Sequence, residues 1–212
     1  MKTRPFSSKS KGYLEVCDLR RAEQSRETKE TTVKTILVID GSGSSQVDTG
    51  VGFFDHMLEL FARHGFFDLM VKAEGDTRVD YHHTVEDTGI VLGKAIALAL
   101  GDRSGIRRYS TEFTPMDESL SMISLDVSGR PYLYFDVQYT GERVGGFDVE
   151  LVEEFFRALC NNGGLTLHVK LIHGRNNHHI IESIFKGFGR ALDRATSVDD
   201  RVAGVLSTKG IL

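Results

Sequence analysis

Apolar residues recur at helical spacing in four segments of the chain. In residues 53–65, Phe54, Leu58 and Phe61 fall on one face of a helix, and Gly65 marks its end. A helix needs this spacing because residues three and four positions apart share a face. The same periodicity predicts further helices over residues 82–101, 149–164 and 178–195.

Other segments alternate apolar and polar residues, as half-buried strands do. Residues 31–40, for example, are rich in Val, Thr and Ile and end at the turn sequence "GSGSS". Strands and helices in both parts of the chain predict an α+β fold, with helices covering one face of each sheet. The predicted strands are residues 31–40, 66–75, 120–129, 130–139 and 165–174.

The order of elements repeats, and a short motif repeats with it. "HHTVE" begins at His82 and "HHIIE" begins at His178, so the copies stand 96 positions apart. This offset indicates a tandem duplication of one unit, a sheet with two helices, whose copies pack through their helices. We expect a first repeat at residues 21–112 and a second at 113–212, which together form one compact catalytic domain.

Composition and charge exclude several classes of protein. The net charge of the 212-residue chain is −4, which gives no general affinity for nucleic acid or for acidic membranes. The apolar run "IVLGKAIALAL" is interrupted by Lys94 and is too short to span a bilayer. Cys17 and Cys160 do not make a disulfide framework and indicate a reducing compartment. We therefore expect a cytoplasmic protein that binds neither nucleic acid nor membrane.

Residues 1–20 differ from the rest of the chain. The sequence "MKTRPFSSKSKG" is basic, rich in Ser and free of acidic residues. This composition is typical of a flexible or loosely docked extension. Transit peptides share the same bias, so a targeting segment is the alternative interpretation.

The repeated motif brings imidazole and carboxylate groups together on a helix. His82 and His83 both lie near Glu86, because residues three and four apart are neighbours, whereas the two histidines point roughly 100° apart. One such helix can therefore offer ligands to two metal ions, or across a subunit interface. The alternative is a set of polar residues at exposed helix starts. Two copies of so rare a pattern favour metal binding.

Two further residues stand at similar distances before the motifs. His56 precedes the first motif by 26 positions, and Glu154 precedes the second by 24. An imidazole in one copy and a carboxylate in the other are both acceptable ligands for Mn or Fe. His56 and Glu154 therefore join the candidate metal ligands.

These residues together resemble the imidazoleglycerol-phosphate dehydratase family of histidine biosynthesis. The resemblance runs from residue 21 to the end, in "RETKET", "GVGFFDHMLELFARHG", "DYHHTVEDTGIVLG", "SLDVSGRPYL", "TLHVKLIHGRNNHHIIESIFKGFGRAL" and "LSTKG". It implies two halves of the ribosomal protein S5 domain 2-like fold. The implied reaction is a carbon–oxygen lyase reaction, in which D-erythro-imidazoleglycerol phosphate loses water to give imidazole acetol phosphate.

The resemblance also implies a cofactor and an assembly. It implies two Mn²⁺ ions per active site, active sites formed where subunits meet, and a homo-oligomer of 24 chains built from trimers. Many members of the family carry His at the position of Glu154, so either Glu154 coordinates in its place or this position lies outside the ligand set. The implied ligands are His56, His82, His83, Glu86, His178, His179 and Glu182.

Catalysis and substrate binding need further groups. Removing a proton from carbon and expelling a hydroxyl requires two acid–base groups. The resemblance points to Glu30 in "TKET" for one of them and to Glu86 or Glu182 for the other. The substrate phosphate requires cations and hydrogen-bond donors. For this role the resemblance points to Arg108, Arg130, Lys186, Ser207 and Lys209.

Two other functions are compatible with the metal ligands. A dimetal hydrolase acting on a phosphorylated small molecule would use the same ligands and cations, with a metal-bound hydroxide as nucleophile. A metal-storage assembly would explain the histidines but would leave "TKET" and the C-terminal Ser and Lys without a role. Formation of a ketone from imidazoleglycerol phosphate separates the dehydratase from both.

Overall fold

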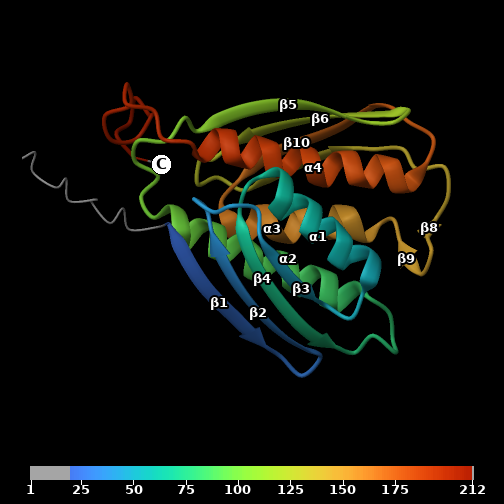
Figure 1. Ribbon diagram of the computed structural model, residues 1–212. Coiled ribbons are helices and arrows are strands. Elements are labelled where there is room, and N and C mark those ends of the chain that lie inside the picture. The colour runs from blue at the N-terminus through green and yellow to red at the C-terminus, as the bar shows by residue number, and fades with distance from the viewer. Residues whose placement is uncertain (1–19, 212) are drawn as a thin grey trace, which may run out of the picture.

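Two four-stranded sheets enclose a layer of four helices in the computed structural model, which describes residues 20–211 (Figure 1). The helices cover the inner face of each sheet and meet one another between the sheets (Figure 1). The expected α+β fold of two similar halves packed through their helices is confirmed. The predicted N-terminal extension, apart from Arg20, lies outside the described residues, as does Cys17.

The first half is built on a mixed sheet with the strand order β1-β2-β4-β3, in which only β3 and β4 run parallel. Helix α1 follows β3, and helix α2 follows β4. The elements are β1 (Arg21–Glu27), β2 (Thr31–Val38), β3 (Ser45–Asp48), α1 (Gly52–His64), β4 (Asp68–Gly75) and α2 (His82–Leu100).

The second half repeats this plan with the strand order β5-β6-β10-β7, in which only β7 and β10 run parallel. A short hairpin, β8 and β9, is added between β7 and α3. The elements are β5 (Tyr109–Met116), β6 (Ser119–Asp126), β7 (Tyr132–Asp136), β8 (Arg143–Val144), β9 (Phe147–Asp148), α3 (Leu151–Gly163), β10 (Thr166–His173) and α4 (Asn177–Thr196).

Strand β5 bears on where the repeats divide. It begins at Tyr109 and pairs with β6, so a division at 112/113 would cut through it. We propose that the repeats divide within residues 101–108 instead. Strands β1, β3 and β5 were not among the predicted strands, because their exposed faces are largely polar and β3 has only four residues.

Helices of different halves pack in pairs, α2 on α3 and α1 on α4. Glycine permits each close approach. A Cβ on Gly93 would lie 2.5 Å from the carbonyl oxygen of Leu159, and a Cβ on Gly189 would lie 2.5 Å from that of Phe61. These distances are far below van der Waals contact, so any side chain would push the helices apart.

Buried phenylalanines fill the space where the helices of the two halves meet. Phe155 packs edge-on against Phe54 at 5.2 Å between ring centroids and stacks on Phe185 at 5.4 Å. Phe188 stacks on Phe61 at 5.3 Å. Each buried aromatic ring contributes about 1.5–3 kcal/mol through loss of water contact. The two halves therefore share one core. Within the described residues, no helix is long and apolar enough to cross a lipid bilayer.

Candidate active site

Both histidine pairs lie in the first turn of a helix, at one end of the helix layer. The N–H of His82 donates to Asp80 Oδ1 at 2.8 Å, and the N–H of His178 donates to Asn176 Oδ1 at 2.9 Å. In each case the accepting side chain lies two residues earlier and satisfies an otherwise free amide at the helix start. The first histidine of each motif therefore has its backbone amide satisfied in the same way.

His56, His178 and Glu182 form a cluster with ligand atoms within 4.8 Å of one another. Nε2 of His56 and Nε2 of His178 each lie 3.8 Å from a Glu182 oxygen, beyond hydrogen-bonding distance. Two imidazoles and a carboxylate that converge without bonding one another fit a divalent metal such as Mn, Fe, Co or Zn. This cluster is a possible metal-binding group. The structure brings α1 and α4 together to form it.

Lys186 lies beside this cluster. Its Nζ is 3.0 Å from Glu182 Oε1 and 3.3 Å from the sulfur of Met116. Glu182 is only 9 % exposed, and a buried carboxylate needs a cationic partner. Lys186 therefore balances the charge of Glu182, and among the residues predicted to bind phosphate it is the one placed with the metal-binding group.

The first motif meets two other acidic residues. Nδ1 of His83 lies 3.0 Å from an oxygen of Asp76, and its Nε2 lies 3.9 Å from a Glu30 oxygen. His82 is 3.9 Å from its helix neighbour Glu86. The hydrogen bond to Asp76 raises the pKa of His83 above its ordinary value.

His179 has a matching environment in the second half. Its Nδ1 lies 2.7 Å from Glu118 Oε2, and its Nε2 lies 3.9 Å from an oxygen of Asp117. The hydrogen bond between His179 and Glu118 raises the pKa of the imidazole and lowers that of the Glu118 carboxyl to about 2. In both halves, one imidazole of the motif therefore lies between two carboxylates.

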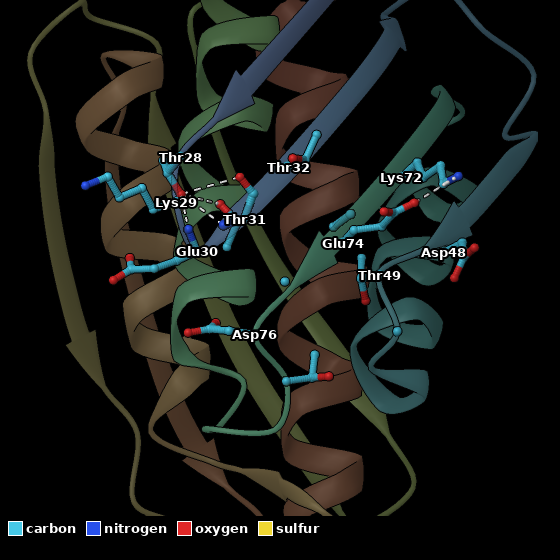
Figure 2. Close-up of a pocket in the computed structure, with 14 residues that line it drawn as sticks. Thr28, Lys29, Glu30, Thr31, Thr32, Asp48, Thr49, Lys72, Glu74 and Asp76 are labelled. Atoms are coloured by element: carbon cyan, nitrogen blue, oxygen red, sulfur yellow. Dashed lines mark hydrogen bonds and ion pairs between the residues drawn. The ribbon is translucent and has the colours of Figure 1, made fainter.

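The turn between β1 and β2 positions Glu30 at the edge of a hollow that Asp76 also lines (Figure 2). The Thr28 hydroxyl accepts the N–H groups of Glu30 and Thr31 at 3.1 and 2.9 Å, shown as dashed lines in Figure 2. Such side-chain to backbone bonds define the shape of a tight turn. Glu30 itself remains more than half exposed.

Asp87 anchors this turn to helix α2. Its buried carboxylate accepts the Thr31 hydroxyl and the Nε–H of Arg26, the latter at 2.7 Å. Arg26 is on β1 and Thr31 on β2, so both strands of the hairpin are held. Because Asp87 follows Glu86 directly, the hairpin that carries Glu30 is fixed relative to the first motif.

Glu154 occupies the position on α3 that His56 occupies on α1. Gly189 of α4 lies against Phe61 of α1 and Gly65, the residue after α1, and Gly93 of α2 lies against Leu159 and Gly163 of α3. Each partner on α3 stands 98 positions after its counterpart on α1, and Glu154 stands 98 positions after His56. Glu154 nevertheless joins no set of three close ligands among the described residues, and it lies 3.7 Å from Arg157.

The remaining predicted phosphate ligands gather elsewhere. A single hollow beside the C-terminal segment is lined by Arg108, Arg130, Ser207 and Lys209. Arg108 is buried, bonds Asp126 at 2.7 Å and donates to the carbonyl of Leu206 at 2.6 Å. The bond to Asp126 raises the pKa of the Arg108 guanidinium further. Arg108 therefore holds the C-terminal segment, while Arg130 and Lys209 remain exposed cations.

This basic hollow and the metal-binding group lie at opposite ends of α4. The N–H of Arg108 donates to the carbonyl of Ala195 at 2.8 Å, near the end of the helix that begins beside His178. Seventeen residues of α-helix separate Ala195 from His178, which is roughly 25 Å. Figure 1 shows the C-terminal segment at one end of the helix layer and the β8–β9 hairpin, beside the start of α4, at the other. One chain does not bring the two groups together.

Sequence reasoning missed three acidic residues that contact the predicted site. Asp76 and Glu118 bond the motif histidines, and Asp87 anchors the hairpin of Glu30. Asp76 and Glu118 lie in a loop and a turn, where acidic residues are common for other reasons. Asp87 could have been recognised from the sequence. It follows the motif by one position, which places this charged residue on the face of the helix that is directed toward the core.

Comparisons with known proteins agree with this geometry. The family model "Imidazoleglycerol-phosphate dehydratase" matches residues 49–192. A protein of that name from Acetivibrio thermocellus is 61 % identical over 193 residues, which cover 91 % of this chain and 99 % of the relative. Another from Alkaliphilus metalliredigens is 62 % identical over 187 residues, which cover 88 % of this chain and 96 % of the relative.

Solved structures give the same result. The imidazoleglycerol-phosphate dehydratase of Staphylococcus aureus superposes with a TM-score of 0.77 at 43 % identity and covers 84 % of this chain and 99 % of its own. The enzyme from Pyrococcus furiosus superposes with a TM-score of 0.77 at 37 % identity and covers 89 % of this chain and 99 % of its own. The chain therefore belongs to the imidazoleglycerol-phosphate dehydratase family.

Proposed function

We propose that this chain catalyses the dehydration of D-erythro-imidazoleglycerol phosphate to imidazole acetol phosphate, a step of histidine biosynthesis. Family membership supports this hydro-lyase activity. The observation that carries the proposal is the convergence of His56, His178 and Glu182 on one point at the start of α4. The first motif, at the start of α2, offers the same types of ligand.

Two Mn²⁺ ions per active site are the cofactor that we assign. Imidazole and carboxylate donors suit this metal, and the His56 cluster fits one such ion. When bound, the ions supply Lewis-acid chemistry that lets the substrate imidazole accept electron density from the neighbouring carbon. The residues that would hold them are His56, His82, His83, Glu86, Glu154, His178, His179 and Glu182.

Acidic residues near the histidines carry the protons. Glu30 presents an exposed carboxylate 3.9 Å from His83 Nε2, on a turn anchored by Thr28 and Asp87. A fixed and accessible carboxylate can accept the proton of the substrate C–H bond. The second acid–base group, which protonates the departing hydroxyl, comes from Glu86 or Glu182. Both residues are also proposed ligands, so each is replaced by Gln in turn and kcat is compared at equal bound Mn²⁺; the variant that loses kcat while fully metallated identifies the acid.

The substrate phosphate binds at the basic hollow. Arg130 and Lys209 are exposed cations there, and the Ser207 hydroxyl accepts the N–H of Lys209 at 3.2 Å, which shapes the segment. Arg108 is already paired with Asp126, so it supports this hollow by holding the C-terminal segment in place. Lys186 contributes its charge at the metal end.

We infer that assembly brings the metal-binding group of one chain and the basic hollow of another into one active site. The substrate is a small molecule, so it cannot span roughly 25 Å between the metal-binding group and the basic hollow of a single chain. The basic hollow of one chain must therefore lie beside the metal-binding group of another. This requirement supports a homo-oligomer with active sites at subunit interfaces, for which we propose 24 chains in the cytoplasm.

The activity is tested with the purified full-length chain, Mn²⁺ and imidazoleglycerol phosphate. We expect the ketone product without release of inorganic phosphate. Release of inorganic phosphate would identify a hydrolase instead. Tight metal binding with neither product would identify a metal-storage protein.

A further inference from the structure

One imidazole of each motif has its Nδ1 against a carboxylate. Nδ1 of His83 lies 3.0 Å from Asp76 Oδ2, and Nδ1 of His179 lies 2.7 Å from Glu118 Oε2. In both cases Nε2 faces the opposite way, toward the carboxylate of a hairpin at 3.9 Å. The two rings therefore have the same orientation relative to their acidic neighbours.

The two carboxylates come from elements that are not equivalent in the duplication. Asp76 belongs to the loop between β4 and α2, whereas Glu118 belongs to the turn between β5 and β6. β10 stands 98 positions after β4, so the counterpart of Asp76 is Gly174, which has no side chain. Duplication therefore does not account for the repeated contact. The same ring atom has acquired an acidic partner separately in each half.

This contact fixes the tautomer of the neutral ring. An ionised carboxylate can only accept, so Nδ1 carries the hydrogen and donates it, and in the neutral imidazole Nε2 then has the lone pair. A histidine that binds metal through one nitrogen commonly donates its other N–H to a carboxylate, which fixes the tautomer and the ring plane. The geometry at His83 and His179 matches this arrangement.

We propose that Asp76 and Glu118 are positioning residues that hold His83 and His179 with Nε2 directed at the metal ions. The inference rests on the proposed function, because it takes these two histidines as metal ligands. Neither Asp76 nor Glu118 touches the reacting atoms. Their effect is on the affinity of the site for metal.

The other hydrogen bonds of Asp76 and Glu118 decide which substitution tests each residue. The hydrogen bonds of the Asp76 side chain among the described residues go to His83, so Asp76→Ala removes that contact. Glu118 also accepts the N–H groups of Arg175 and Asn176 through Oε1. Glu118→Gln keeps this acceptor and turns an amide N–H₂ toward His179, which favours the wrong tautomer.

The test measures Mn²⁺ affinity of the full-length protein without substrate. We expect Asp76→Ala and Glu118→Gln each to weaken binding roughly 10- to 100-fold. Thermal stability of the metal-free protein should remain close to that of the wild type, and saturating Mn²⁺ should restore most of kcat. Glu74→Gln is the matched control, because this carboxylate lies two residues before Asp76 and pairs with Lys72 instead of an imidazole.

Unchanged Mn²⁺ affinity in either variant would overturn the proposal. An equal loss in Glu74→Gln would also overturn it, because the effect would then be one of general charge. His83→Ala and His179→Ala separate this failure from a failure of the proposed function. If those variants bind Mn²⁺ like the wild type, the ligand assignment itself is wrong.

Discussion

The two halves of the molecule share a backbone plan but differ in their polar contacts. Strand order, helix order and the close approach at Gly93 and Gly189 are repeated. The polar contact between the second strand and the motif helix is not repeated. Thr31 bonds the carboxylate of Asp87 in the first half, whereas Ser121 bonds the hydroxyl of Ser183 in the second.

This difference separates what folding requires from what the site requires. The uncharged Ser121–Ser183 pair, at 2.6 Å, joins strand to helix without any ion. A buried carboxylate is more costly and needs several partners, which Arg26 and Thr31 supply. Since the fold is satisfied without it, Asp87 indicates a role specific to the first half, where its hairpin carries Glu30.

The largest expected effect is equal in the two halves. His83→Ala and His179→Ala should each abolish turnover, because each removes one of the metal ligands that we propose. Steady-state kinetics with metal analysis of the purified variants checks this prediction. A fully metallated and fully active His179→Ala enzyme would contradict the site assignment.

Replacing the glycine at either helix crossing should destabilise the protein by a similar amount. Gly93→Ala and Gly189→Ala each place a Cβ 2.5 Å from a carbonyl oxygen, and we expect each to lower the free energy of unfolding by about 1–3 kcal/mol. Urea unfolding measures the change. Gly52→Ala is the control, because its Cβ would meet no atom within 4 Å. Markedly unequal losses would show that the two crossings are not equivalent.

Removing the polar contact between strand and motif helix should affect kcat in the first half and only stability in the second. Thr31→Val leaves Asp87 short of a donor and frees the hairpin of Glu30, so we expect kcat to fall about 10-fold, at a cost of 1–3 kcal/mol in stability. Thr31→Ser, which keeps the hydroxyl, should restore kcat. Ser121→Ala should cost stability and leave kcat unchanged, and a similar loss of kcat there would remove the distinction between the halves.

Lowering the pH should weaken Mn²⁺ binding by protonating one histidine in each half. Hydrogen bonds to Asp76 and Glu118 raise the pKa values of His83 and His179 above the ordinary value of 6.5. A raised pKa means that the proton is retained to higher pH, and Mn²⁺ must displace it. Affinity should therefore be full above this raised range and fall as the pH drops through it. Mn²⁺ titrations across a pH series check the prediction, and a flat profile from about pH 6 to 8 would contradict it.

Much of the fold was predictable because its signals are local. The four helices follow from apolar spacing, and the duplication follows from the identical offset of two motifs. Strand β3, with its burial pattern of mostly exposed residues, gave no such signal. Its place in the sheet depends on pairing with β4, a contact that the sequence does not reveal.

The candidate site was predictable in its residue types and less so in its arrangement. His56, His178 and Glu182 were all candidate ligands, and they converge. Their spacing placed His56 before the first motif, whereas its meeting with the second motif depends on the packing of α1 on α4. The pairing of Lys186 with Glu182 and of Arg108 with Asp126 was not visible, because each depends on which elements meet in space. The separation of the basic hollow from the metal-binding group likewise follows only from the direction of α4.

The central claim is that one active site uses the metal end of one chain and the basic end of another. Mixing two defective variants during assembly tests it most directly. His179→Ala lacks a ligand at the metal end, and Arg130→Ala combined with Lys209→Ala lacks the cations of the basic hollow. Lys209→Ala alone should mainly raise KM, so the combined variant gives the larger defect.

Each variant should have little activity when assembled by itself. In oligomers that contain both at equal amounts, some sites will combine an intact metal end with an intact basic end from the other variant. We predict recovery of about a quarter of the wild-type activity, since each intact end is present in half of the chains. Mixed oligomers that stay as inactive as the separate variants would contradict the claim that two chains share each site.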